Sequence, residues 1–474
     1  MRVSRQPATG FAYERTARVQ DWAAVVLAAG QGKRMHSSQP KVLHTLAGRP
    51  MVRHVIDALR GAGFERPVVV VGQGGAEVRR ALGDGFLYAE QRRRLGTGHA
   101  LRQAEGLAGD AADVLVLNGD IPLVSAETVS TLVAHHKETG ADLTLLTANV
   151  EDSRGLGRLQ RNGKHVEIIE EADIEGPVGG QAEVNVGVYC FRGSWLWPRL
   201  RRLRRRASGE YYLTQLVADA GRNNNRLETV LSPQPEEALG VNDRLQLAQA
   251  EAIVRERIRR RHLLAGVSMV DPSTVYIDAD VEIGGDTVLW PNTYLLGSTR
   301  VGPGCVLGPD AYLLDSRVGA RCRVVSSVLE GAVLEDEVEV GPFSHLRPGS
   351  YIEQGVHVGN FAEVKNARLG RRTKVGHFSY IGDAQVGADV NIGAGTITCN
   401  FDGTRKHRTV IGDKAFIGSD TMLVAPVEVG ARSATGAGSV VNHDVPADSL
   451  AVGMPARVRR RRTSAPKSRR DKGA

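Results

Sequence analysis

Residues 283–308 read IGGDTVLWPNTYLLGSTRVGPGCVLG, and a branched apolar residue returns at every sixth position of this stretch. These positions are Ile283, Leu289, Leu295, Val301 and Leu307. Neither the 3.6-residue period of an α-helix nor the two-residue period of a half-buried strand gives this spacing. A parallel β-helix with three flat sides does, because each side needs one inward apolar residue followed by a turn.

The six-residue spacing persists over most of the second half of the chain. It begins at Ile277 and reaches Leu313 before a first phase slip. Beyond the slip, the expected inward residues are Val328, Leu334, Val340, Leu346, Ile352, Val358, Val364, Leu369, Val375, Ile381, Ile411, Ile417, Leu423 and Val429. Glycine often follows directly, which suits turns that need positive φ or close backbone approach. We therefore expect a left-handed parallel β-helix of hexapeptide repeats over residues 266–456.

One polar stretch, Cys399–Arg408 with the sequence CNFDGTRKHR, interrupts the period at length. Its polar and charged side chains cannot fill a coil, so we expect it to project from the β-helix as a loop. Insertions in solenoid proteins tend to lie on the binding face, which makes this loop a candidate part of a site.

Residues 21–244 follow a different pattern, in which apolar runs of strand length alternate with helical stretches. The strand candidates are 23–28, 67–71, 114–117 and 143–146, and the helix candidates are 52–59, 76–82 and 126–138. This alternation predicts an α/β, Rossmann-like domain with a parallel sheet covered on both faces. Ligands of such sheets bind beyond the carboxyl ends of the strands. An amphipathic helix over 245–265 is expected to link this domain to the β-helix.

The net charge of +8 is concentrated at the two ends of the chain. Residues 1–20 hold four Arg and one Glu, and residues 457–474 hold nine Lys or Arg and one Asp, so the part between them carries a net charge of −3. A nucleic-acid-binding domain should carry its positive charge on a folded face. We therefore expect both ends to be disordered basic tails and no specific nucleic acid as a partner.

Cysteine usage and hydropathy indicate the compartment. The four cysteines, at 190, 305, 322 and 399, are widely spaced and form no CxxC pair, which predicts reduced thiols in a cytoplasmic protein. No apolar run approaches the ~20 residues that span a bilayer, so membrane insertion is not expected. The first twenty residues contain no apolar block, so we expect no secretory signal.

The first predicted strand leads into a glycine-rich turn, Gly30-Gln31-Gly32, followed by basic residues. Glycine lets backbone N–H groups approach phosphate oxygens, and Lys or Arg neutralises their charge. A dinucleotide fingerprint is excluded, because Met35 stands where the third glycine is needed. Gly30-x-Gly32 alone fits a plain tight turn equally well, but Lys41 follows closely and can reach the same phosphates.

Two more segments follow predicted strands. Gln91 precedes the loop Leu95-Gly96-Thr97-Gly98-His99, which suits a base edge or a ribose. Asp120 comes just after the buried strand 114–117, at the expected ligand edge. It is a candidate for Mg²⁺, which prefers one or two carboxylates plus phosphate oxygens, although a turn or helix cap would explain it too.

The motifs Leu27-Ala28-Ala29-Gly30-x-Gly32-x-Arg34-Met35, Lys41, Leu95–Gly98 and Gly119-Asp120-x-Pro122-Leu123 resemble those of sugar-nucleotide pyrophosphorylases. Gly209–Thr214 and Gly240–Leu245 narrow this resemblance. Together with the hexapeptide repeats, the whole of 21–456 resembles the bacterial bifunctional N-acetylglucosamine-1-phosphate uridylyltransferase/glucosamine-1-phosphate acetyltransferase family. The several long motifs occur in the same order, which makes the match specific.

The resemblance assigns a nucleotide site to the first domain. It implies that the uridine nucleotide is held by Leu27, Ala28, Ala29, Gly30, Gln91, Gly96 and Thr97, and that its phosphates are bound by Arg34 and Lys41. The implied ligands of Mg²⁺ are Asp120 and Asn242. The implied sugar-binding residues are Gly157, Glu170 and Asn185. The sugar 1-phosphate would attack the α-phosphorus of UTP and release pyrophosphate. Asn118 departs from the Tyr of the family pattern beside the metal loop.

The resemblance assigns acetyl transfer from acetyl-CoA to the β-helix. His377 would be the general base, a role that suits a side chain titrating near neutrality, although its residue type alone also fits an ordinary surface His. The amino-sugar phosphate would be held by Arg347, Lys365, Tyr380 and Asn391. The coenzyme A site would be lined by Ala394, Asn400, Phe401, Ser419, Ala437 and Arg457. Phe401 replaces a family Tyr, and Met454 lies in an ending, Gly453–Arg457, that resembles other hexapeptide acyltransferases. A homotrimer with sites between subunits is implied.

Two other functions are compatible with this organisation. The chain would be a glucose-1-phosphate nucleotidyltransferase if its repeat tail only formed oligomers, but His377, Lys365 and Arg347 argue against an inert tail. It would be a non-catalytic regulatory subunit if the phosphate and metal residues had been lost, but Arg34, Lys41 and Asp120 are all present.

Overall fold

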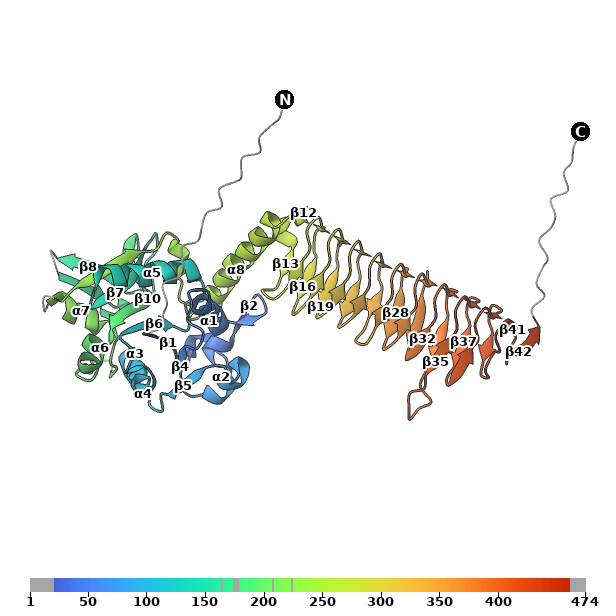
Figure 1. Ribbon diagram of the computed structural model, residues 1–474, viewed down its shortest axis with the longest axis horizontal. Helices are drawn as coiled ribbons and strands as arrows, with labels where there is room; N and C mark the ends of the chain where they lie inside the picture. Colours follow the sequence, from blue (N-terminus) through green and yellow to red (C-terminus); the bar gives the residue numbers. More distant parts are fainter. Residues whose placement is uncertain (1–20, 163–164, 174–178, 207–208, 223–224, 461–474) are drawn as a thin grey trace, which may run out of the picture. The chain divides into compact units, whose positions relative to one another are not determined.

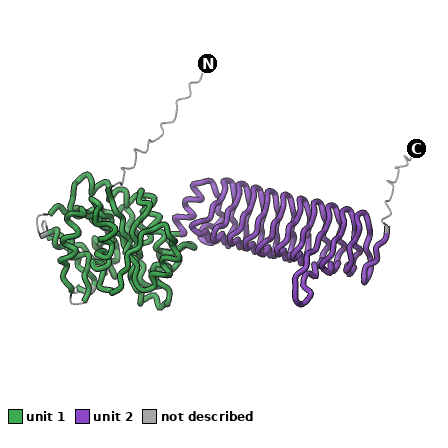
Figure 2. Tube along the Cα trace, turned by 60° about the horizontal axis from the view of Figure 1, so that its bottom comes forward, with its two compact units in different colours: residues 1–254 green, residues 255–474 purple. Residues whose placement is uncertain are grey.

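A computed structural model describes residues 21–460, apart from 163–164, 174–178, 207–208 and 223–224. The chain divides into two compact units, residues 1–254 and 255–474 (Figure 2). The basic ends expected to be disordered, 1–20 and 461–474, lie outside the described residues. No helix among the described residues is both long and apolar enough to cross a membrane.

The first unit is built on a mixed sheet with the strand order β11-β7-β10-β6-β1-β4-β5 (Figure 1). The strands are β1 (Trp22–Ala28), β4 (Val68–Val71), β5 (Leu87–Glu90), β6 (Asp113–Asn118), β7 (Leu143–Val150), β10 (Ala182–Arg192) and β11 (Leu227–Leu231). All of these are parallel to their neighbours except β10, which runs antiparallel to β6 and β7. The parallel sheet predicted from the sequence is therefore present, with β10 as the antiparallel exception.

The direction of β10 follows from its connection. It arrives from a hairpin of β8 (Arg158–Asn162) and β9 (His165–Ile169), and β8 also pairs with β10. The middle of β10 is buried like that of a parallel strand, so its apolar pattern carries no information about its direction.

Helices cover both faces of the sheet. They are α1 (Met51–Gly61), α2 (Gly75–Leu82), α3 (Thr97–Gln103), α4 (Glu105–Ala108), α5 (Ala126–Thr139), α6 (Gly193–Leu200) and α7 (Gln215–Arg222). Apolar residues of α1, α2 and α5 form one core, and those of α3, α4, α6 and α7 form the other. Alternate residues of β1 enter opposite cores, Val26 the first and Val25 the second. This explains the continuous apolar run of the strand.

Four parallel strands place the candidate motifs at one edge. The in-register pairs of β1 with β4 and β6, and of β4 with β5, bring their carboxyl ends together. Gly30, Gln91 and Asp120 all follow these ends within two residues. The sequence prediction that the ligand edge collects these residues is supported by the topology.

The helix α8 (Arg244–Leu264) follows, and the division between the two units falls within it, after Val254. The apolar spacing of the sequence predicts an inward face of Leu247, Ala250, Val254 and Ile258. The last three are buried, whereas Leu247 is half-buried.

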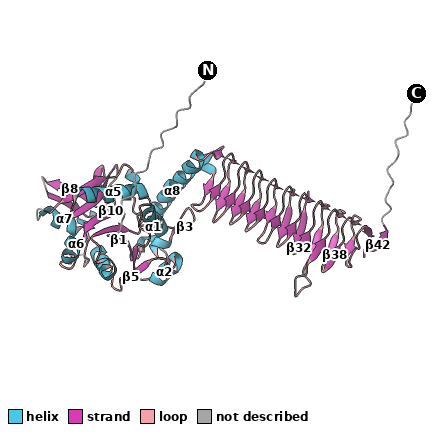
Figure 3. Cartoon of the chain, in the orientation of Figure 1, coloured by secondary structure: helices cyan, strands magenta, loops and turns pink. Residues whose placement is uncertain are grey.

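The second unit is a left-handed parallel β-helix made of three sheets with 12, 10 and 9 strands (Figure 3). Tyr276 pairs with Tyr294, and Tyr294 with Tyr312, so one coil takes three six-residue sides. Leu289, Leu295 and Leu307 are fully buried at the predicted inward positions. The hexapeptide interpretation is confirmed.

The phase after the first slip needs one correction. Leu329, with no exposed surface, is the inward residue of β22 (Val328–Glu330), whereas Val328 is 36% exposed. The sides from Leu313 to Val318, from Val324 to Leu329 and from Leu329 to Leu334 are each one residue short, so the register moves by one residue at each of them. The next inward residue, Leu334, is again at its predicted position.

The predicted loop is present between β34 (Ile397–Cys399) and β35 (Thr409–Ile411), and it projects from the β-helix (Figure 1). A bridge between Phe401 and Lys406 closes it. Asp402 accepts hydrogen bonds from the backbone N–H of Arg405 and Thr404, and its Oδ2 lies 2.6 Å from Nε2 of His407. These bonds hold the pKa of Asp402 well below its usual range.

The expected C-terminal tail begins later than the sequence suggests. Residues Arg457–Arg460 form β42, which runs antiparallel to β41 (Ser449–Val452). The last coil leaves a strand edge whose backbone groups pair with any extended segment, whatever its side chains. The run of arginines therefore misled the prediction for residues 457–460.

Candidate functional site

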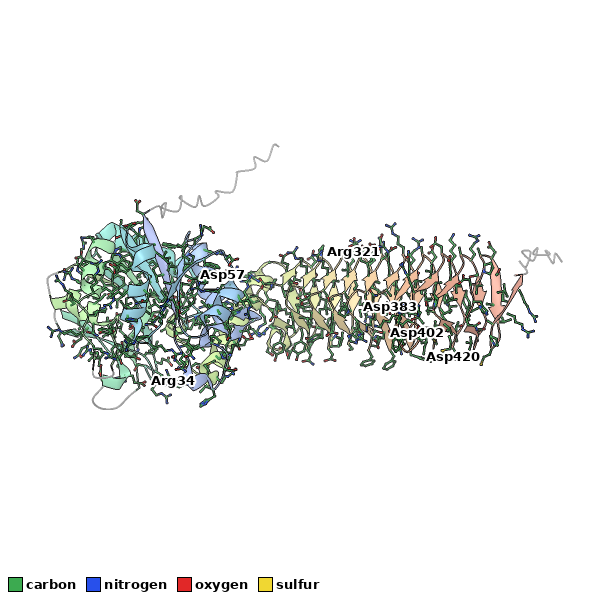
Figure 4. All side chains as sticks on the ribbon, turned by 90° about the horizontal axis from the view of Figure 1, so that it is seen from below. Arg34, Asp57, Arg321, Asp383, Asp402 and Asp420 are labelled. Atoms are coloured by element: carbon green, nitrogen blue, oxygen red, sulfur yellow. The ribbon has the colours of Figure 1, made fainter. Side chains whose placement is uncertain are left out.

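Gly32 allows the glycine-rich turn of the first unit to pack against Lys41. Its φ is +64°, and a Cβ there would lie 2.6 Å from the Cβ of Lys41. Any side chain would displace Lys41, so this glycine is required by both conformation and space. Arg34 lies in the following 3₁₀ turn, Lys33–Met35, with its side chain exposed at the surface (Figure 4).

Lys41 joins two residues that are distant in sequence. Its Nζ donates to Oδ2 of Asp120 at 2.5 Å and to Oδ1 of Asn242 at 3.0 Å. Lys41 is only 7% exposed. The backbone N–H of Val241 donates to the carbonyl of Asp120, which ties the two acceptor segments together. The predicted phosphate lysine and both predicted metal ligands therefore meet at one point.

The two side-chain oxygens around Lys41 fit a divalent cation. A carboxylate and an amide oxygen already converge on one positive charge, and both are hard oxygen ligands of the kind Mg²⁺ takes. Among the described residues, no group of three or more His, Cys, Asp or Glu side chains could hold a metal by itself. The remaining ligands of a Mg²⁺ would have to be phosphate oxygens or water, as is usual for this ion.

The loop Leu95–Gly98 is held by the segment Tyr211–Leu213. The N–H of Gly98 donates to the carbonyl of Tyr211, and the N–H of Tyr211 donates to that of Leu95. A Cβ at Gly96 would lie 2.6 Å from the Tyr211 carbonyl oxygen, and its φ is +92°. Thr97 accepts from the N–H of Leu213, so its hydroxyl also has a structural partner. Two motifs that lie more than 100 residues apart in the sequence, Leu95–Gly98 and Gly209–Thr214, thus form one structure.

The three predicted sugar residues also lie together. The N–H of Asn185 donates to the carbonyl of Gly157 at 2.9 Å, and a Cβ on Gly157 would lie 3.5 Å from Oε2 of Glu170. Glu170 accepts from the hydroxyl of Thr214, which continues the segment that holds the Leu95–Gly98 loop. The sugar and nucleotide candidates therefore belong to one connected region.

Asn118 faces the irregular middle of β10. It pairs with Leu27 in the β1–β6 register, and a Cβ on Gly187 would lie 2.4 Å from its Nδ2. Gly187 has a φ of +89° at the register shift between Asn185 and Tyr189. The sequence reasoning missed Gly187, which holds space for Asn118 next to Leu27.

In the second unit, Arg347, Lys365 and Tyr380 lie on the 10-stranded sheet. They belong to or follow β25 (His345–Leu346), β28 (Ala362–Lys365) and β31 (Ser379–Gly382), which pair in this order. Nη1 of Arg347 donates to Oε1 of Glu363 at 2.9 Å, and this carboxylate raises the pKa of the guanidinium. Glu363 is directly opposite Tyr380 in the register.

Lys406, from the projecting loop, joins this group. Its contact with Lys365, and then the charge of Arg347, lower the pKa of Lys365. Three cations therefore gather where the sequence had indicated two. The interrupted period predicts that the loop belongs to a site, but nothing in the sequence distinguishes Lys406 from the other residues of the loop.

A second set of predicted residues forms a column at one corner of the coils. His377 is exposed there, between β30 (Lys374–Val375) and β31, and Ala394, Ser419 and Ala437 follow in the next three coils. Backbone bonds stack these turns. The N–H of Gly395 donates to the carbonyl of Phe378, and the N–H of Asp420 donates to the carbonyl of Ala394. In the next coil, the N–H of Gly438 donates to the carbonyl of Ser419.

The remaining predicted residues lie elsewhere on the β-helix. Asn391 is in β33 (Asn391–Ile392) of the 12-stranded sheet, not on the sheet of Arg347 and Lys365. Nδ2 of Asn400 donates to Oδ2 of Asp383 at 2.5 Å and lies 3.5 Å from the Tyr380 hydroxyl. Figure 4 shows Asp383, Asp402 and Asp420 following one another along the β-helix.

Two predicted coenzyme residues are solvent-facing. Phe401 is 60% exposed in the projecting loop, and Arg457 is exposed at the start of β42. Within one chain, the predicted acetyl-CoA residues are therefore distributed over the corner column, the loop and the last strand.

The comparisons with known proteins cover both units. Residues 24–220 match the model of the MobA-like NTP transferase domain. The Bifunctional protein GlmU of Heliobacterium modesticaldum is 46% identical over 433 residues, which are 90% of this chain and 94% of that protein. The proteins of the same name from Streptococcus equi subsp. zooepidemicus and Pelobacter propionicus are 44% and 45% identical, over 92% and 93% of this chain and 95% and 98% of theirs. The chain belongs to the family of bifunctional GlmU proteins.

Proposed function

We propose that this chain is a bifunctional transferase that makes UDP-N-acetylglucosamine in two steps. The β-helix, residues 266–456, transfers the acetyl group of acetyl-CoA to the amine of glucosamine-1-phosphate. The α/β domain, residues 21–244, then transfers the uridylyl group of UTP to N-acetylglucosamine-1-phosphate and releases pyrophosphate. The observation that carries the proposal is that each unit brings its own phosphate-binding candidates together. Lys41 meets the metal candidates Asp120 and Asn242 in one unit, and Lys365 lies with Arg347 and Lys406 in the other.

Uridylyl transfer needs positioning and charge neutralisation more than covalent chemistry. A phosphate oxygen of the sugar attacks the α-phosphorus of UTP, and the bond to pyrophosphate breaks. Lys41 and Arg34 would neutralise the phosphates, and Gly157, Glu170 and Asn185 would orient the sugar. Asp120 and Asn242 would hold Mg²⁺, which supplies charge compensation for the triphosphate when bound.

The nucleotide would lie along the carboxyl edge of the sheet. Leu27, Ala28, Ala29 and Gly30 provide backbone at the end of β1, and Gln91, Gly96 and Thr97 provide the platform two strands away. The short loop structure around Tyr211 supports this arrangement, because it fixes the backbone of Gly96 before any ligand arrives.

Acetyl transfer needs a neutral amine and a route for its proton. The amine nitrogen attacks the thioester carbonyl, a C–N bond forms, and the C–S bond breaks as coenzyme A leaves. His377 would take a proton from the attacking nitrogen and return one to the departing sulfur. The sugar phosphate would be held by Arg347, Lys365, Lys406 and Tyr380. Asn391, which lies on a different sheet, would contribute from a neighbouring β-helix.

The distribution of the coenzyme candidates supports a shared site. Ala394, Ser419 and Ala437 share one corner, whereas Asn400, Phe401 and Arg457 lie apart from it. A homotrimer in which neighbouring β-helices complete each acetyl-CoA site would bring these sets together. We place the enzyme in the cytoplasm, where its small-molecule substrates are made.

One assay tests the whole proposal. The purified chain is incubated with glucosamine-1-phosphate, acetyl-CoA, UTP and Mg²⁺, and UDP-N-acetylglucosamine and free thiol are measured together. Both products should appear, and omission of acetyl-CoA should stop both. A chain that consumes glucose-1-phosphate and UTP without releasing thiol would instead be a simple nucleotidyltransferase. A chain that releases neither product would be a non-catalytic subunit.

A further inference from the structure

Gln91 lies at the carboxyl edge of the sheet, and its neighbours fix the orientation of its side chain. It follows β5 directly, its N–H donates to the carbonyl of Val71, and it is only 4% exposed. The next residue after Val71, Gly72, packs so closely on Ala29 that a Cβ there would lie 2.8 Å from the Ala29 carbonyl oxygen. Gln91 is therefore joined to the end of β1 through one intervening strand.

Both hydrogens of the Gln91 side-chain amide are used within the protein. Nε2 lies 3.1 Å from the carbonyl oxygen of Gly96 and 3.0 Å from Nδ1 of His99. A carbonyl oxygen only accepts, so the amide nitrogen, and not its oxygen, must face Gly96. The same rotamer makes His99 Nδ1 an acceptor and leaves Oε1 of Gln91 without a hydrogen-bond partner among the described residues.

His99 is suited to this accepting role. Burial, and then the charges of Arg102 and Arg93, lower its pKa, so the neutral ring with a lone pair on Nδ1 is favoured. The ring stacks on Tyr211 with centroids 6.4 Å apart, and Gln103 donates to its backbone carbonyl at 2.9 Å. Its position in α3 is therefore fixed from two sides.

We propose that His99 is a positioning residue that makes Gln91 present a carbonyl oxygen, and only that oxygen, to the nucleotide base. This inference rests on the proposed function, in which Gln91 faces the pyrimidine of UTP. An oxygen acceptor pairs with the N3–H of uracil, whereas N3 of cytosine is itself an acceptor. The hydrogen bonds from Gln91 to His99 and Gly96 therefore select an imide base such as uracil. With cytosine, the Gln91 oxygen and N3 would both be acceptors, and two buried polar groups would be left without a hydrogen bond.

The test is the ratio of kcat/KM for UTP to that for CTP in the full chain. His99→Phe keeps a ring to stack on Tyr211 and removes the acceptor. It should lower the UTP/CTP ratio by about tenfold or more, mainly through a higher KM for UTP, since one hydrogen-bonded amide loses its fixed orientation. His99→Asn retains an acceptor oxygen and should recover most of the ratio. Acetyl transfer by the other unit should be unchanged in both variants, and thermal unfolding of the full chain shows whether the first unit is folded.

A double-mutant cycle separates positioning from a general structural effect. Gln91→Met removes both the donor and the acceptor, so His99→Phe should change the ratio no further in that background. An equal loss in both backgrounds would overturn the proposal, as would an unchanged ratio in His99→Phe. His99→Met provides the same cycle if the Phe variant does not fold. A wild-type chain that does not prefer UTP to CTP would instead refute the proposed nucleotide, independently of His99.

Discussion

Lys41 and Asp120, 79 positions apart in the chain, form an ion pair of 2.5 Å at the carboxyl edge of the sheet. Lys41 has little exposed surface, and Asn242 accepts from the same ammonium. A carboxylate held this close to a buried cation is already compensated in the free chain. Its charge becomes available for a metal only when Lys41 has another anion to contact, so triphosphate and Mg²⁺ should bind together.

Asp120→Ala should abolish uridylyl transfer and leave acetyl transfer intact. Loss of a metal carboxylate leaves triphosphate charge uncompensated and costs several kcal/mol of transition-state stabilisation, or at least about 10³-fold in rate. The two activities are measured on the same preparation at saturating Mg²⁺. Asp57→Ala is the matched control, because Asp57 lies on α1, away from the ligand edge, and pairs there with Arg53 and with Arg49, which precedes the helix. Retained Mg²⁺-dependent transfer in Asp120→Ala would remove this residue from the metal site.

The fold of both units can be predicted from the sequence, because the local residue patterns are consistent with one another. The six-residue period predicts the β-helix, and alternation of short strands with helices predicts the α/β unit. The exceptions have physical causes. A strand buried on both faces, such as β10, has no pattern that shows its direction, and a short side, as at Leu329, shifts the phase without changing composition.

The site is less readable than the fold. Gly32 and Asp120 stand in recognisable motifs, but Gly187 is required only because Asn118 comes close to it from another strand. Lys406 acquires its role from a tertiary approach to Lys365. Residues of this kind carry no signal in a single sequence, since the contact that defines them exists only in the fold.

Lys406→Ala should raise the KM for glucosamine-1-phosphate by about 10- to 100-fold and leave the KM for acetyl-CoA nearly unchanged. A cation that contacts a phosphate makes a charge-assisted hydrogen bond, and its loss weakens ground-state and transition-state binding alike. The pKa of Lys365 should rise in the variant, because a like charge has been removed beside it. Arg405→Ala removes one exposed charge from the same loop and should leave both KM values near those of the wild type. Equal effects of the two variants would mean that the loop acts only through its net charge.

A fragment that ends within α8 should retain uridylyl transfer alone, and its end point should matter. Glu251 accepts from the N–H of Ala47 at 2.7 Å, and Ala250 is fully buried. Residues 1–244 should therefore transfer uridylyl groups but unfold at a lower temperature than residues 1–265. Thermal unfolding and UDP-N-acetylglucosamine formation are measured for both fragments. A folded, soluble fragment of either length without uridylyl transfer would contradict the assignment of this activity to the first unit.

His262 should make the second unit less stable in acid. Burial first, and then Arg261, lower its pKa to about 4. The unfolded chain binds a proton near the ordinary value of 6.5 and the folded chain does not, so stability present above pH 6.5 is lost as the pH falls towards 4. His262→Gln should remove about 2 kcal/mol of the loss in unfolding free energy between pH 7 and pH 5. His443→Gln, at an exposed position of the same unit, should leave the pH profile unchanged.

His377→Ala should lower the kcat of acetyl transfer by ~10²–10⁴-fold, the contribution of a positioned general base, while uridylyl transfer stays unchanged. Near neutral pH the amine of glucosamine-1-phosphate is mostly an ammonium group, which cannot attack a thioester, so its proton has to leave before or during C–N bond formation. His377 is exposed at the corner that also carries Ala394 and Ser419, and its removal should barely shift the KM for acetyl-CoA. His357→Ala is the control. His357 lies in the coil before that of His377, and its side chain is paired with Glu339. If His377→Ala keeps a near-normal kcat, another group or solvent accepts the proton, and the base has been assigned wrongly even though the family stands.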